Sequence, residues 1–198
     1  MSNLFIVISS ILALISPLVY AYSILKGKSK PHRTTRLVLL IITSLTTISL
    51  FFQGNRVAIY LAGISTLQSI IIFGLSINYG MVGYSKSDII CFIIALTGIV
   101  LWQITKNPVI ALYFAIFADF IGMIPAMIKT YRFPKTEIYL FYLLDVFASF
   151  FSLLAITNRT FEEFSYPIYI MIINLVMIGL ILLPNFSKKS FLPKFGSK

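Results

Sequence analysis

The stretch Ala118–Ile156, which decides the fold, reads ADFIGMIPAMIKTYRFPKTEIYLFYLLDVFASFFSLLAI. Two apolar runs flank a short basic turn, which predicts two membrane helices joined on one side of a bilayer. Each run carries one aspartate near its middle, Asp119 and Asp145. A carboxylate is expensive to bury in hydrocarbon and usually faces a bundle interior or a water-filled cavity. The two aspartates are therefore the first candidates for a functional role.

The composition of the whole chain is that of an integral membrane protein. Of its 198 residues, 59% are hydrophobic and only 11% are charged, whereas a soluble domain carries about 25% charged residues. The net charge of +10 does not indicate nucleic-acid binding, because the basic residues lie in short clusters between apolar runs. The single cysteine and single histidine form no metal-ligand cluster, and we expect no metal and no cofactor.

Seven segments are long and apolar enough to span a bilayer, which takes about 20 residues. We expect helices over Asn3–Leu25, Arg36–Phe52, Val57–Asn78, Ser87–Thr105, Pro108–Thr130, Thr136–Thr157 and Ser165–Pro184. The short links Gln53–Arg56 and Lys106–Asn107 should make the helices on either side of them antiparallel neighbours. We expect the same of the two helices that carry Asp119 and Asp145, which a short turn also joins.

The basic residues predict the orientation in the membrane. Thirteen of the 16 lie at one side of the expected helices, and only Arg56, Lys106 and Arg159 lie at the other. The positive-inside rule puts the larger group in the cytoplasm. The N-terminus should then lie outside and the C-terminus in the cytoplasm of a plasma or inner membrane. The basic tail, 185–198, either lies on anionic lipid or is a solvated stop-transfer segment.

The chain also contains an internal repeat. ISPLVYAYSILKGKSKPHRTTRLVLLIITS, near the N-terminus, aligns with MIPAMIKTYRFPKTEIYLFYLLDVFAS. The alignment pairs Pro17 with Pro125, Thr34 with Thr136, Thr43 with Asp145, Tyr60 with Tyr169, and Ser65 with Asn174. It divides the chain into a first three-helix repeat (1–86), a linker helix (87–107), a second three-helix repeat (108–184) and the tail. The predicted fold is an all-α integral membrane protein with seven transmembrane helices, arranged as two parallel repeats in a 3+1+3 plan found in transporters.

These features resemble the SWEET and PQ-loop (MtN3-like) superfamily. The resemblance rests on Ser16-Pro17 in the first helix, on the basic turn Pro134-Lys135-Thr136-Glu137 and on the 3+1+3 layout. Leu18 and Ala126 stand where the PQ-loop form has a glutamine after the proline. The resemblance implies transport of small polar solutes such as sugars, amino acids or vitamins. One branch, similar to the KDEL receptors, implies instead a receptor that sorts peptides.

The resemblance also implies a binding site between the third and seventh helices. SWEET sites use an asparagine in each of these helices. Asn174 stands at the position in the seventh helix, whereas the third helix offers Ser65 at the matching position and Gln68 one turn later.

Depth in the membrane points to the same region without the resemblance. Asp119, Asp145, Asn174, Gln68 and Thr43 all lie near the centres of their helices, and transporter sites lie near the midplane at the repeat interface. We therefore expect a substrate site formed by residues that share this depth or the same helix stripe: Asn174, Gln68, Ser65, Thr43 and Tyr142.

Asp119 and Asp145 are the candidates for proton coupling. No lysine or arginine lies at their depth, and burial without a cationic partner favours the neutral form of a carboxyl group. We expect at least one of the two to be protonated at neutral pH, and the pair to titrate as a unit if the groups are close. Pro17 and Pro125 interrupt helix hydrogen bonds and are candidate hinges, or simple packing kinks.

Two functions stay open from the sequence. The first is a transporter that works by alternating access, with a small-molecule substrate and the lipid bilayer as its partners. The second is a non-transporting receptor or sorting factor on the same scaffold. An enzyme is less favoured, because the spans hold no His, Cys and Glu constellation and no catalytic residue stands out. The serines and threonines have a structural alternative, which is bonding to their own helix backbone. The sequence leaves the oligomeric state open.

Overall fold

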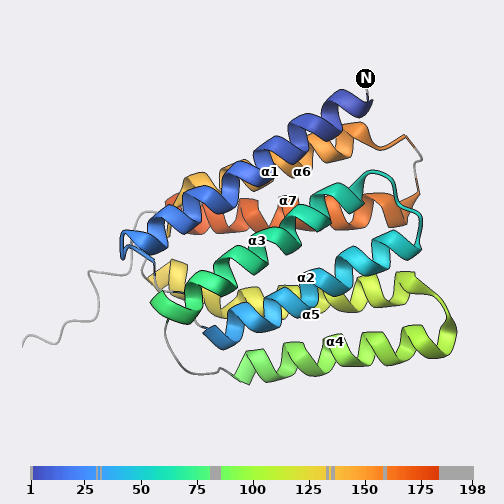
Figure 1. Ribbon diagram of the computed structural model, residues 1–198, viewed down its shortest axis with the longest axis horizontal. Helices are drawn as coiled ribbons and strands as arrows, with labels where there is room; N and C mark the ends of the chain where they lie inside the picture. Colours follow the sequence, from blue (N-terminus) through green and yellow to red (C-terminus); the bar gives the residue numbers. More distant parts are fainter. Residues whose placement is uncertain are drawn as a thin grey trace, which may run out of the picture.

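The fold consists of seven helices, drawn in Figure 1 from a computed structural model that describes residues 2–29, 31, 33–80, 86–132, 134, 137–157 and 160–182. In chain order they are α1 (Ser2–Leu25), α2 (Arg33–Phe52), α3 (Ala58–Tyr79), α4 (Lys86–Thr105), α5 (Pro108–Arg132), α6 (Tyr139–Ala155) and α7 (Phe161–Leu182). The described residues contain no strand, so the predicted all-α class with seven helices is confirmed. The predicted tail, 185–198, lies outside the described residues.

Three helices begin at least three residues away from the expected position. Helix α2 begins at Arg33, three residues earlier than Arg36. Helix α6 begins at Tyr139, three residues later than expected, because Ile138 is still extended. Helix α7 begins at Phe161, four residues earlier than Ser165. Its first turn holds Glu162 and Glu163, and negative charge is favourable at a helix N-terminus, where the macrodipole is positive. These two glutamates, which precede the expected start at Ser165, therefore belong to the helix.

The helices have the length and surface of membrane spans. Six of the described helices are long and apolar enough to cross a bilayer, and α6, with 17 residues, is a shorter apolar helix. Large apolar side chains cover the outside of the bundle, including Val7, Phe51 and Leu182, which are each more than half exposed. Such a surface suits lipid rather than water. The protein is an integral membrane protein with several spans.

The link between α2 and α3 contains a tight turn and a helix cap. Gly54 ends α2 with a left-handed φ of 70°, a conformation that costs glycine little. Asn55, three residues before α3 begins, caps its start, since the Asn55 side-chain oxygen accepts hydrogen bonds from the backbone N–H groups of Val57 and Ala58 at 3.0 and 2.8 Å. Such a cap satisfies N–H groups that a helix start leaves without partners. As expected, α2 packs against α3 and α4 packs against α5.

The helices form two layers of three (Figure 1). One layer runs α1, α3, α2 and the other runs α6, α7, α5, so that α1 faces α6, α3 faces α7 and α2 faces α5; α4 packs outside, against α5 and α2. The expectation that α5 and α6 are neighbours is wrong, because α7 lies between them. A six-residue link reaches up to about 20 Å, and packed helix axes lie about 8–10 Å apart. The link from α5 to α6 is therefore long enough to pass one intervening helix.

The pairing of the layers has an internal regularity. Exchanging α1, α2 and α3 with α5, α6 and α7 turns the facing pair α1/α6 into α5/α2 and leaves α3/α7 unchanged. In each triad the third helix contacts the other two. This is the contact pattern that a repeat would give. The superposition of the two triads, with Pro17 on Pro125, stays a prediction.

Small residues let α4 and α5 approach closely. Ala111, Ala115 and Ala118 on α5 are fully buried against Cys91 and Ala95 of α4 in one apolar cluster. Small side chains at a membrane-helix interface allow close backbone contact. This packing leaves the other face of α5, including Asp119, directed towards the space between the layers, where Asp119 lines a cavity.

Candidate functional site

A cavity of about 370 Å³ lies between the two layers and is lined by α1, α2, α3, α5, α6 and α7. Its wall includes all seven residues expected to bind substrate or carry protons: Thr43, Ser65, Gln68, Asp119, Tyr142, Asp145 and Asn174. The candidate hinge Pro17 is fully buried inside α1, and Pro125 lies within α5. The structure therefore gathers polar residues of five helices, those expected near the membrane midplane, around one space.

Asp119 is held by a tyrosine of the neighbouring helix. The hydroxyl of Tyr169, on α7, donates a short hydrogen bond to Oδ2 of Asp119, on α5. Both side chains line the cavity. Arg36, at the start of α2, is the cation whose charge acts on Asp119. This tyrosine fixes the carboxyl group in the wall while leaving its other lone pairs available.

Asp145 has different partners. Ser16 of α1 and Gln68 of α3 are the hydrogen-bonding side chains beside its carboxyl group. Ser16 also lies 3.3 Å from the carbonyl oxygen of Phe141, to which it donates. Asp145 therefore contacts helices of the opposite layer, α1 and α3, whereas Asp119 contacts α7 in its own layer. The expectation that the two carboxyl groups titrate as one unit stays a prediction.

Three further polar residues present oxygen atoms to the cavity. The hydroxyl groups of Thr43 and Ser65 donate to the backbone carbonyls of Leu40 and Leu61, at 3.2 and 3.0 Å. The amide nitrogen of Asn174 donates to its own helix at 2.8 Å. Hydroxyl and amide oxygens keep lone pairs when the donor is used in this way. Together with the two carboxyl groups, these residues make the middle of the wall rich in hydrogen-bond acceptors.

Charged and aromatic groups line the cavity towards what we call the basic end, the end of the bundle formed by the last turns of α1, α3 and α5 and the first turns of α2, α4 and α6. Here Nη2 of Arg36 donates to the hydroxyl of Tyr20 at 3.0 Å, and its guanidinium lies 5.2 Å from the centre of that ring. The Tyr142 hydroxyl donates to Oε2 of Glu137 at 3.0 Å. Because Pro31, in the link before α2, also lines the wall, the cavity extends to the loops of this end.

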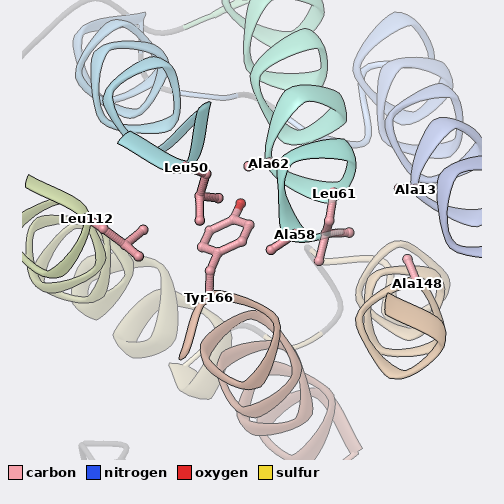
Figure 2. Packing of buried hydrophobic residues seen from close by; sticks show 8 residues of the cluster. All are labelled: Ala13, Leu50, Ala58, Leu61, Ala62, Leu112, Ala148 and Tyr166. Carbon is pink, nitrogen blue, oxygen red and sulfur yellow. The ribbon is translucent and has the colours of Figure 1, made fainter. Parts of the chain in front are cut away.

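An apolar cluster closes the opposite end of the cavity. Figure 2 shows Tyr166 of α7 pointing across the bundle towards Leu50 and Ala62, with Leu61 and Leu112 around it. Tyr166 is 4% exposed and Leu50 is fully buried, so the packing leaves no passage here. Tyr166 and Leu61 belong both to this cluster and to the cavity wall. They form the floor of the cavity.

Sequence reasoning missed several site residues. Five lie in the wall, Tyr20, Arg36, Glu137, Tyr166 and Tyr169, and the buried Ser16 lies behind it, beside Asp145. In the sequence, Arg36 stands at the start of an expected helix next to a basic loop, where a positive charge indicates topology only. The tyrosines lie towards the ends of the expected helices, where aromatic residues usually mark the membrane interface. Tyr169 had one signal, its match to Tyr60, but Tyr60 is 54% exposed and lies outside the cavity wall.

The chain matches no protein-family model, and searches of curated proteins and of solved structures find no similar protein. The resemblance to the SWEET and PQ-loop superfamily therefore stays an expectation. Among the described residues, no three His, Cys, Asp or Glu side chains are grouped so that they could hold a metal ion.

Proposed function

We propose that the protein carries a small polar solute across the membrane by alternating access, coupled to protons through Asp119 and Asp145. One observation carries this proposal: a cavity of about 370 Å³ inside a membrane bundle is lined by both carboxyl groups and by polar side chains of five helices. Small-molecule sites have volumes of about 300–1,000 Å³. Ionisable groups inside a membrane protein usually mark a substrate or proton pathway, because an apolar residue would be cheaper there.

The two ends of the cavity support the alternating-access part of the proposal. The wall extends to the loops of the basic end, and the Tyr166 cluster closes the other end. If the positive-inside rule holds for this chain, the cavity faces the cytoplasm in this conformation. Transport then requires a second conformation in which α7 draws Tyr166 away from Leu50 and Ala62. The facing layers are the units that would move against each other, with Pro17 and Pro125 as the candidate hinges.

The partners of the carboxyl groups support the proton-coupling part. Asp119 accepts from Tyr169, and Asp145 lies beside Ser16 and Gln68. The contacts of Asp145 cross between the two layers that an alternating motion would shift, whereas the contact of Asp119 joins two helices of one layer. A neutral carboxyl group can both donate and accept, whereas an ionised one only accepts. Loss of the proton therefore changes which neighbours the side chain can keep, and this would couple protonation to helix packing.

The test is proton movement in vesicles that contain the purified protein. Proteoliposomes are loaded with the pH-sensitive dye pyranine, and gradients of single sugars, amino acids and vitamins are applied from outside. We expect at least one solute to acidify the lumen of vesicles with the wild-type protein. Asp119→Asn and Asp145→Asn, which keep the side-chain volume but cannot titrate, should abolish the signal.

Glu162→Gln is the matched control, since it removes an exposed carboxylate in the first turn of α7, away from the cavity. It should leave the signal unchanged. Solute uptake at wild-type rates in both Asn variants would show that the carboxyl groups are structural. Absence of uptake for every solute, in protein shown to be folded, would contradict transport itself and favour the receptor alternative.

A further inference from the structure

The cavity has a polarity along its length that constrains the solute. Its middle is lined by oxygen acceptors, Thr43, Ser65 and Asn174, together with the two carboxyl groups. The first turn of α2 adds a single arginine, Arg36, to the wall at the basic end. Seven residues separate Arg36 from Thr43 on α2, which is about 10 Å along the axis at a rise of about 1.5 Å per residue. A solute that spans the cavity meets Arg36 at one end, together with the Glu137 carboxylate that accepts from Tyr142, and further acceptors deeper in.

The guanidinium of Arg36 is positioned rather than free to move into solvent. Its Nη2 donates to the Tyr20 hydroxyl at 3.0 Å, and the group lies against the face of the same ring at 5.2 Å. Tyr20 is itself held, being 3% exposed and packed on Phe141 with a ring separation of 4.9 Å. An arginine carries five N–H donors in a planar fork, and the bond to Tyr20 uses one of them. A fork held in this way suits bidentate binding of a carboxylate or phosphate group.

The neighbouring arginine shows that this arrangement is not a general property of the basic end. Arg33 lies one turn earlier on α2, and its Nη2 donates to the backbone carbonyl of Ile77 at 2.5 Å. Ile77 is in the last turn of α3, where helix carbonyls lack partners in the helix. Arg33 therefore ties two helices together. Arg36 instead contacts a tyrosine and borders the cavity.

We infer that the solute carries an anionic group, a carboxylate or a phosphate, which Arg36 binds, and a hydroxyl or ammonium group that donates to the acceptors deeper in the cavity. The inference rests on the proposed function and narrows its substrate class. A neutral solute would gain no charge-assisted hydrogen bond from Arg36, so it should bind less tightly than an acid or phosphate of similar shape. Tyr20 is the residue that positions Arg36.

The experiment measures binding with matched pairs of probes that differ only in the anionic group. Thermal unfolding of the full-length protein in detergent is followed with 4-aminobutyrate and 4-aminobutanamide, lysine and lysinamide, and glucose 6-phosphate and glucose. We expect at least one acid or phosphate to stabilise the protein with an affinity about tenfold or more above that of its neutral partner, which is the effect of one charge-assisted hydrogen bond. The lysine and glucose pairs separate the carboxylate source from the phosphate source.

Variants locate the anionic site. Arg36→Gln should reduce the affinity for the acid about tenfold or more and leave the affinity for the neutral partner unchanged. Arg36→Lys should retain part of the affinity for the acid. Arg33→Gln, the matched control, should retain all of that affinity. Tyr20→Phe keeps the ring but removes the hydroxyl group that positions Arg36. It should reduce the affinity for the acid several-fold, although the charge of Arg36 is still present. If Arg36→Gln fails to fold, Tyr20→Phe and the paired probes on wild-type protein still test whether Arg36 binds an anionic group.

Binding of a neutral probe as tightly as its acid, or binding of the acid to Arg36→Gln as tightly as to wild type, overturns the inference and leaves transport intact. Failure of every probe to stabilise the protein also overturns it. Selective acid binding without proton or solute movement in vesicles would uphold the anionic site and reject the proposed transport.

Discussion

The hydrogen bond between Tyr169 and Asp119 offers a direct measurement of the state of the carboxyl group. Tyr169→Phe removes the donor hydroxyl and leaves the ring in place between α7 and α5. Interhelical hydrogen bonds between neutral groups in membrane proteins contribute about 0.6 kcal/mol on average, and up to about 1.7 kcal/mol. A bond to an ionised group contributes about 1.5–3 kcal/mol. The size of the loss therefore reports whether Asp119 is neutral or charged.

The effect of Tyr169→Phe is best compared between the wild type and a variant whose acceptor at position 119 cannot ionise. Asp119→Asn keeps a side-chain oxygen that Tyr169 can bond, so Tyr169→Phe in that background measures the neutral bond alone. Our proposal predicts that Tyr169→Phe lowers the free energy of unfolding by about 0.6–1.5 kcal/mol at pH 6, both in the wild type and in the Asn background. The measurement is reversible unfolding in mixed micelles.

Tyr60→Phe is the control, because Tyr60 is the counterpart of Tyr169 in the sequence repeat but is 54% exposed on α3. Its effect should lie within about 0.5 kcal/mol of zero, as for most surface substitutions. A loss above about 2 kcal/mol in wild type alone would mean an ionised carboxylate and would refute the neutral state that proton coupling requires. No loss in either background would show that the two groups do not interact in solution.

Three further predictions concern topology and packing. Lys28→Cys and Arg159→Cys should be labelled from opposite sides of the membrane by an impermeant thiol reagent, and labelling from one side would contradict the orientation argued from the basic residues. Gly98→Ala should destabilise the protein by about 1–3 kcal/mol, because a Cβ there would lie 2.6 Å from Phe114, whereas Gly74→Ala, with nothing within 4 Å, should be neutral or stabilising in unfolding measurements. Asn55→Ala should cost about 1 kcal/mol in the same assay through loss of the α3 cap, and Asn55→Asp, which keeps an acceptor, should cost less.

The number of helices and their apolar character could be predicted from sequence because both are local properties. About 20 apolar residues make a span, and a link such as Gly54-Asn55 carries its own turn and cap chemistry. The order of the helices within a layer is not local. A link of six residues limits how far α6 can start from the end of α5, but it does not say that α7 fills the space between them. The neighbour relation of α5 and α6 was therefore wrong, although their boundaries were nearly right.

In the candidate site, too, some residues could be predicted from local properties and others depend on how the helices pack. The position of Asp119 and Asp145 near the centres of apolar helices carried a large energetic signal, since a carboxylate in lipid is costly, and both residues border the cavity. Arg36 and Tyr169 carried no such signal. A charge or an aromatic ring near a helix end satisfies the usual rules for the membrane interface, so the sequence gives no reason to look for a second role. Only the packing of the layers brings Arg36 to the same wall as Asp145.

The hydrogen bonds of Thr43, Ser65 and Asn174 also bear on how polar residues in membrane helices are interpreted. Each group donates to a carbonyl of its own helix, which is the usual structural explanation for such residues. Yet the same bond orients the side chain and uses its only free donor, or one of two for the amide, so that oxygen lone pairs are what remains for the cavity. The same side chain can therefore bond to its helix backbone and also bind a solute. On our proposal, the wall selects solutes by their donors, and Arg36, the one arginine among the described residues of the cavity wall, distinguishes an acidic solute from a neutral one.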